Sequence, residues 1–100
     1  MRYYIVFLQT IDAAGASQYQ QAHFEYQSSL RLQGVIFAHG RLTDGWGGVA
    51  VYRAGSEADV RLYVEEDPFV RNGIRSYEIH EWDMKLAPDV SVGAREEGTK

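Results

Sequence analysis

The chain has 100 residues, 45% of them hydrophobic and 24% charged, which is the size and composition of one folded domain. Its 14 acidic and 10 basic residues give a formal net charge of −4, and no two Lys or Arg residues are adjacent. Nucleic acid is therefore not an expected partner, since phosphate binding needs a basic surface. The absence of cysteine excludes disulfides, thiolate catalysis and cysteine-ligated metal.

The N-terminal segment contains an apolar run at residues 3–8 that is too short for a signal peptide or a membrane span. Gln9, Thr10 and Asp12 interrupt any extension of this run. We therefore expect a cytoplasmic, soluble protein that has no membrane partner.

Residues 2–9 predict a strand, since they are rich in β-branched and aromatic side chains. The run at 3–8 is apolar at every position, which is typical of a strand buried on both faces. Residues 16–33 predict a helix, because an apolar stripe recurs at helical spacing, with Gly34 as its C-cap. The stripe consists of Tyr19, His23, Tyr26 and Leu30.

A hairpin follows, with strands at 35–42 and 48–54 joined by the turn "TDGWGG", whose glycines we expect to supply positive φ. A second helix is predicted from the N-cap Ser56 to Glu66 or Asp67, where Pro68 stops it.

A last strand is predicted at 74–86, and residues 87–100 are expected to form a loosely ordered tail. The order β-α-β-β-α-β predicts an α+β fold of the ferredoxin-like type, with both helices on one face of a four-stranded antiparallel sheet. We expect this single domain to span residues 1–86. Because the first strand calls for cover on both faces, we also predict a homodimer through the open sheet face.

Two residues are candidates for catalysis. Position alone favours His23 as a core histidine bonded to a backbone carbonyl, but imidazole also suits a general acid or base. Asp67 is either a helix-end residue that accepts backbone hydrogen bonds or a functional carboxylate. If the two residues meet, the carboxylate would fix the tautomer of the imidazole and stabilise its protonated form. The predicted fold permits this meeting, since both helices lie on one sheet face.

His39 and Arg41 are candidates for holding a substrate anion, although position alone favours a structural or surface role for His39 and a solvated strand end for Arg41. Strict alternation places them on one strand face with Val35 and Phe37, opposite a face that carries Ile36, Ala38, Gly40 and Leu42. His80 is expected to share a face with Trp82. The three histidines have no short metal-ligand spacing, so no metal site is predicted.

Four segments of the chain together resemble the YciI-like (YCII-related) family of the dimeric α/β-barrel superfamily. They span about residues 2–86, and the helix histidine combined with Asp-Pro-Phe is their most specific feature. The segments are "AHFEYQSSL" with "QGVIFAHGRL", "DGWGGVAVY", "SEADVRLYVEEDPFVRNG" and "YEIHEWDMKL".

The resemblance implies a ferredoxin-like subunit that dimerises through its sheet, with His23 and Asp67 as the catalytic dyad and Phe69 as a wall of the pocket. Family members of known activity act on small organic molecules without metal or nucleotide, and one branch is similar to an aromatic-pathway dehydrochlorinase. This chain departs from the family in two places. Gly40-Arg41 stands where Gly-Pro is frequent, and Gln20 and Gln21 stand where a basic residue is frequent.

Two functions are therefore open. In the first, the chain is a cofactor-independent enzyme in which His23 moves a proton on a small cyclic or aromatic metabolite, in an isomerisation or an elimination. In the second, it is a dimeric module that binds a small molecule or a partner without turnover, and the His–Asp pair is a structural network. A haem-binding or oxygenase relative in the same superfamily is a third alternative.

Overall fold

The computed structural model describes residues 1–90, and it confirms the predicted α+β fold. A short extra helix is inserted between the second long helix and the last strand. The elements are β1 (Arg2–Thr10), α1 (Ala16–Leu32), β2 (Ile36–Arg41), β3 (Gly47–Ala54), α2 (Glu57–Glu66), α3 (Pro68–Arg71) and β4 (Arg75–Glu81).

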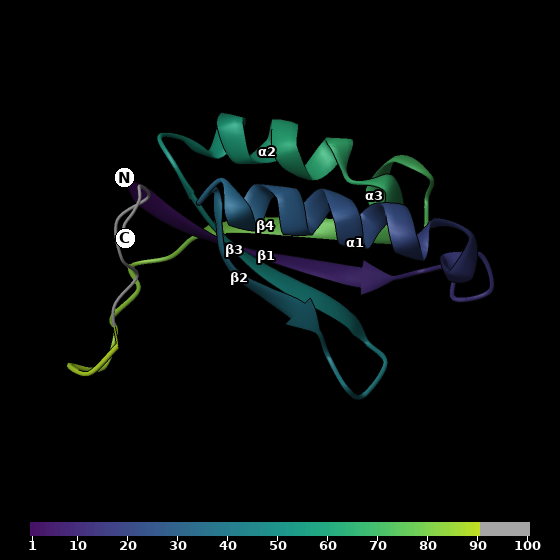
Figure 1. Cartoon of the computed structure of the whole chain (residues 1–100), viewed down its shortest axis with the longest axis horizontal. Coiled ribbons are helices and arrows are strands. Elements are labelled where there is room, and N and C mark those ends of the chain that lie inside the picture. Colours follow the sequence, from purple (N-terminus) through teal and green to yellow (C-terminus); the bar gives the residue numbers. More distant parts are fainter. Residues whose placement is uncertain (91–100) are drawn as a thin grey trace.

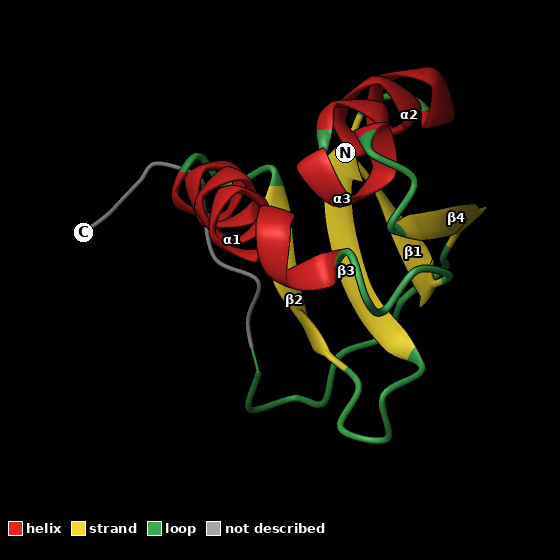
Figure 2. Cartoon of the chain, turned by 90° about the vertical axis from the view of Figure 1, so that its right-hand side faces the viewer, coloured by secondary structure: helices red, strands yellow, loops and turns green. Residues whose placement is uncertain are grey.

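The four strands form one antiparallel sheet in the order β2-β3-β1-β4. The helices all lie on one side of it, and the other side is open (Figure 1). Viewed end-on, α1 lies over the β2 side of the sheet, and α2 and α3 lie over the β1 and β4 side (Figure 2). This is the ferredoxin-like arrangement, and it brings helices distant in sequence onto one sheet face.

Strand β1 lies in the middle of the sheet and alternates between two environments. Tyr4, Val6 and Leu8 are buried beneath the helices, whereas the side chains between them are half-buried on the open face. The apolar run of β1 is thus covered on one face only within a single chain.

The turns use their capping and glycine residues as expected. Gly34 follows α1 with φ of 80°, and the amide of Val35 closes the turn on the carbonyl of Leu30. The hydroxyl of Ser56 accepts a hydrogen bond from the amide of Asp59 at the start of α2. At Gly47, φ is 154° and a Cβ would lie 2.0 Å from the carbonyl oxygen of Leu8, so only glycine fits.

The last strand is shorter than predicted, since it ends at Glu81 and not near residue 86. The reason is its partner: β4 runs antiparallel to β1, Glu81 pairs with Tyr4, and the amide of Trp82 makes the next bond to Tyr3. Since β1 begins at Arg2, the register leaves no residue of this strand opposite Met84, Lys85 or Leu86. Of the tail predicted at 87–100, residues 91–100 lie outside the described part of the chain.

The predicted face of His39 is wrong because β2 contains a β-bulge. The register shifts between Ile36, which pairs with Tyr52, and Ala38, which pairs with Val51. The extra residue, Phe37, packs its ring against Tyr3 on the open face. As a result Ile36 enters the core under the helices and His39, three residues later, faces the same side.

Within residues 1–90, none of the helices combines the length and apolar character that a membrane crossing requires.

Candidate functional site

His23 and Asp67 are in direct contact between α1 and the end of α2. The Nδ1 atom of His23 lies 2.8 Å from one carboxylate oxygen of Asp67 and 3.0 Å from the other. Both residues are buried, with 7% and 1% of their surfaces exposed. An ionised carboxylate only accepts hydrogen bonds, so Nδ1 carries the proton and the neutral ring has its lone pair on Nε2.

The backbone around Asp67 explains why an aspartate occupies this corner. Asp67 is at once the C-cap of α2 and the N-cap of α3, in an extended conformation. Its Oδ1 accepts the amide hydrogen of Phe69 at 2.9 Å, and Pro68 begins α3, where a missing amide hydrogen costs nothing. The new helix directs Phe69 back against the dyad, and its ring stacks on the His23 ring with 4.1 Å between centroids.

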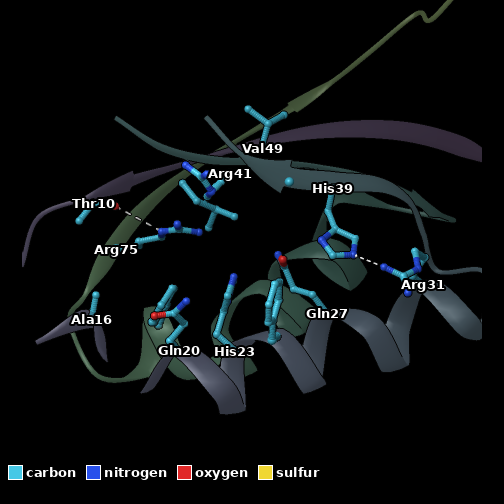
Figure 3. Close-up of a pocket in the computed structure, with 14 residues that line it drawn as sticks. Thr10, Ala16, Gln20, His23, Gln27, Arg31, His39, Arg41, Val49 and Arg75 are labelled. Atoms are coloured by element: carbon cyan, nitrogen blue, oxygen red, sulfur yellow. Dashed lines mark hydrogen bonds between the residues drawn. The ribbon is translucent and has the colours of Figure 1, made fainter. Parts of the chain in front are cut away.

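A cavity of about 480 Å³ lies between α1 and the sheet, a size suited to a small organic molecule. His23 points from α1 into it (Figure 3). The lining comes from α1, α3 and the strand ends and includes no acidic side chain. It consists of Leu8, Thr10, Ala16, Gln20, His23, Phe24, Gln27, Arg31, His39, Gly40, Arg41, Val49, Phe69 and Arg75.

All three residues that the sequence suggested for substrate binding lie in this lining. Phe69 is buried against His23, and Arg41 is exposed at the end of β2. His39 faces α1, where the guanidinium of Arg31 donates to its Nε2 at 3.0 Å (Figure 3). Burial lowers the pKa of His39, and the charge of Arg31 lowers it further. His39 is therefore a neutral imidazole whose remaining proton sits on Nδ1.

His80 lies elsewhere in the structure. It is on β4 opposite Ile5, on the open face, where it contacts Phe7 and pairs with Glu78 at 3.0 Å.

Four polar residues of the cavity were not singled out from the sequence: Thr10, Gln27, Arg31 and Arg75. Arg75 begins β4 and is half-buried, with its guanidinium 4.8 Å from the centre of the Phe69 ring and its Nε 3.4 Å from the hydroxyl of Thr10. Gln27 is 3% exposed. Spacing could have found Arg75 and Gln27, because Arg75 shares a strand face with the core-facing Tyr77 and Ile79, and Gln27 lies one helical turn after His23.

Across residues 1–90, no group of three or more His, Cys, Asp or Glu side chains is arranged so that it could hold a metal ion.

Comparison with known families identifies the family of the chain. The model of the YCII-related domain matches residues 1–83. The chain belongs to this family. Among curated proteins, no significant match to the chain is found.

A solved structure resembles this YCII-related chain closely in fold. It is the 5-chloro-2-hydroxyhydroquinone dehydrochlorinase of Burkholderia phenoliruptrix AC1100, in complex with 2,5-dihydroxybenzoquinone. The TM-score is 0.71 at 19% sequence identity, and the match covers 83% of this chain and 95% of the other. At this identity the similarity establishes the shared fold.

The structure shows where the residues lie at which this YCII-related chain differs from the family pattern. Gln20, Gly40 and Arg41 line the cavity. Gln21 instead points along the exposed side of α1, where its amide donates to Glu25 at 3.0 Å. Of the residues that differ from the family pattern, Gln20 and Arg41 therefore lie in the wall of the cavity.

Proposed function

We propose that the chain is a cofactor-independent enzyme that uses His23 and Asp67 for acid–base chemistry on a small cyclic or aromatic metabolite. The observation that carries this proposal is the contact of 2.8 Å between Asp67 and Nδ1 of His23 at the wall of the cavity. It leaves the Nε2 lone pair of His23 available to a molecule bound there. Both hydrogen bonds of the His23 ring are to Nδ1, and no residue among 1–90 forms one with Nε2.

In the proposed reaction, Nε2 of His23 accepts a proton from a carbon or hydroxyl of the bound ring. The electron pair left behind moves into the ring. In an isomerisation the same imidazolium returns the proton at another atom, and in an elimination the electron pair expels an anionic leaving group. Asp67 holds the ring orientation through both steps and offsets the charge of the imidazolium.

Proton NMR in D₂O tests this proposal, because both reaction types change the spectrum of the protons bound to ring carbons. Suitable probes are 5-chloro-2-hydroxyhydroquinone, for elimination, and a set of cyclic enol lactones, for isomerisation. We expect protein-dependent turnover of at least one probe. The variant H23A should lower kcat at least ~100-fold, the contribution typical of a positioned general base.

The matched control is Q21A, which changes an exposed side chain of the same helix two residues away. It should keep the wild-type rate. If H23A turned over a substrate as fast as wild type, His23 would not be the base and the proposal would fail.

The dyad also supports a structural alternative, because Asp67 accepts the Phe69 amide and thereby joins α2 to α3. In that case the chain would bind a small molecule without turnover. We further propose that the chain acts as a homodimer through the open sheet face, since the apolar side chains of β1 on that face stay half-exposed in one chain.

A further inference from the structure

Positive charge is concentrated around the cavity although the chain as a whole is acidic. Three of its ten basic residues, Arg31, Arg41 and Arg75, line this one cavity, and no Asp or Glu does. Outside the cavity the pattern differs: three exposed arginines each lie within 4 Å of a glutamate. These pairs are Arg2 with Glu81, Arg61 with Glu57 and Arg71 with Glu66.

Arg75 is the most constrained of the cavity arginines. Its side chain is half-buried, stacked on Phe69 and directed toward the hydroxyl of Thr10 (Figure 3). Within residues 1–90, no carboxylate lies within 4 Å of its guanidinium nitrogens. Burial lowers the pKa of Arg75, and the charge of Asp67 opposes that shift. A guanidinium remains charged at neutral pH even so, and a half-buried cation without a counter-ion suits an anionic ligand.

Gln27 provides an independent sign of a ligand. Its side chain is almost completely buried, yet its Nε2 has no hydrogen-bond partner anywhere in residues 1–90. Buried amide groups are nearly always satisfied. Gln27 lies one helical turn beyond His23 and lines the same cavity, and its side chain points from α1 toward the sheet (Figure 3).

We propose that the cavity binds a small ring-shaped anion, whose charged oxygen pairs with Arg75 and whose second oxygen accepts a hydrogen bond from Nε2 of Gln27. In Figure 3, His23 lies between these two residues. A ring held at both ends therefore presents its middle to Nε2 of His23. This inference rests on the proposed function for the role of His23, and it names the substrate class: aromatic or cyclic carboxylates, phenolates and enolates that carry a second oxygen.

Binding of benzoate and benzamide tests the anion site, because the two molecules share shape and differ in charge. In an NMR titration of the wild-type protein, benzoate should bind at least about tenfold more tightly than benzamide. The variant R75Q should bring this ratio close to one. R75K, which keeps the charge, should retain most of the preference. The control R61Q removes an exposed arginine of α2 and should leave the ratio unchanged.

The second contact is tested with 3- and 4-hydroxybenzoate. At least one of them should bind more tightly than benzoate, and Q27L should abolish that gain while keeping the preference for benzoate over benzamide. Thermal unfolding of each variant verifies that it is folded. Equal binding of benzoate and benzamide to the wild-type protein, or an unchanged ratio in a folded R75Q, would overturn the anion site.

The anion site and the proposed reaction can fail separately. H23A should keep the preference for benzoate, because Arg75 and Gln27 remain in place. If the preference exists but H23A does not slow turnover, the anion site stands and His23 is not the base. If H23A abolishes turnover while benzoate and benzamide bind equally, the reaction stands and the substrate is not held as an anion.

Discussion

A single carboxylate, that of Asp67, connects the chemistry of the cavity with the geometry of the chain. It accepts hydrogen bonds from the His23 ring and from the Phe69 amide, and it caps both α2 and α3. Loss of the side chain would therefore affect folding and chemistry together. A test of its function must keep the cap while it changes the dyad.

The variants D67A and D67N separate these two roles. D67A leaves a buried amide and a buried imidazole without a partner, so we expect unfolding free energy to fall by about 2–4 kcal/mol. D67N keeps an oxygen for the Phe69 amide and should cost less than about 1.5 kcal/mol. Its amide group donates to Nδ1, which moves the ring proton to Nε2 and removes the lone pair from the cavity. Turnover should then fall ~10²–10⁴-fold.

Urea unfolding and steady-state kinetics provide the two measurements. D83A is the control for both, since Asp83 is exposed and pairs with Lys85. A folded D67N protein with wild-type turnover would show that the reaction does not depend on the carboxylate of Asp67.

At the residue scale, the sequence indicated His23 and Asp67 as candidates for catalysis. It could not show that they are in contact, because 44 positions separate them. Spacing places Arg75 and Gln27 on the faces that look toward the cavity, but it could not show that, within residues 1–90, Arg75 would lack a counter-ion and Nε2 of Gln27 a hydrogen-bond partner. Arg75 resembles an ordinary strand end, and a glutamine on a helix resembles a solvated residue. Their role in the cavity depends on which side chains are left without partners, and only the packed molecule determines that.

Among the elements, β2 shows where pattern-based prediction stops. The strand itself was predicted within one residue at either end, but its faces were not, because alternation assumes a regular ladder. The bulge at Phe37 keeps Ile36 in the core and still turns His39 and Arg41 toward α1. By contrast, the helix ends were predictable, since Gly34, Ser56 and Pro68 act through local backbone geometry.

The two long helices are joined by a partly buried hydrogen bond, in which the hydroxyl of Tyr26 on α1 donates to the carbonyl of Tyr63 on α2 at 2.6 Å. Burial raises the pKa of Tyr26 to about 12, with smaller contributions from the charges of Asp67 and Glu66. In the unfolded chain the hydroxyl titrates near its ordinary value of 10. The bond thus stabilises the fold fully below pH 10, and its contribution is lost as the pH rises toward 12.

We therefore expect Y26F to lower the unfolding free energy by about 0.5–1.5 kcal/mol at pH 7. The variant should also lose less stability than wild type between pH 10 and 12. Urea unfolding across this range measures both effects. The control Y19F changes a half-buried tyrosine of the same helix that makes no side-chain hydrogen bond within residues 1–90. An identical alkaline loss in wild type and Y26F would contradict this account.

At the scale of the whole molecule, one face of the sheet is still to be covered. The open face carries half-buried apolar side chains from two strands: Tyr3, Ile5, Phe7 and Phe37. An apolar sheet face of this kind is the expected interface between two copies of the chain.

The variant I5D tests this interface, since Ile5 lies on a central strand of the open face. Light scattering during size-exclusion chromatography should give a dimer for wild type and a monomer for I5D, because a charge would have to be buried in the interface. L62D, on an exposed side chain of α2, should remain dimeric. Circular dichroism verifies folding. A monomeric wild-type protein at tens of micromolar, or a dimeric I5D, would rule out this interface.

The amide of Phe69 gives the molecule a built-in spectroscopic probe. Its hydrogen points at the same carboxylate oxygen that holds the His23 ring. Any ligand or proton that changes the electron density on that carboxylate must shift the resonance of this backbone amide. The state of the dyad can thus be followed by nitrogen–proton correlation spectra from a peptide group that takes no part in turnover. A search for substrates can begin with that one peak, before any reaction product is known.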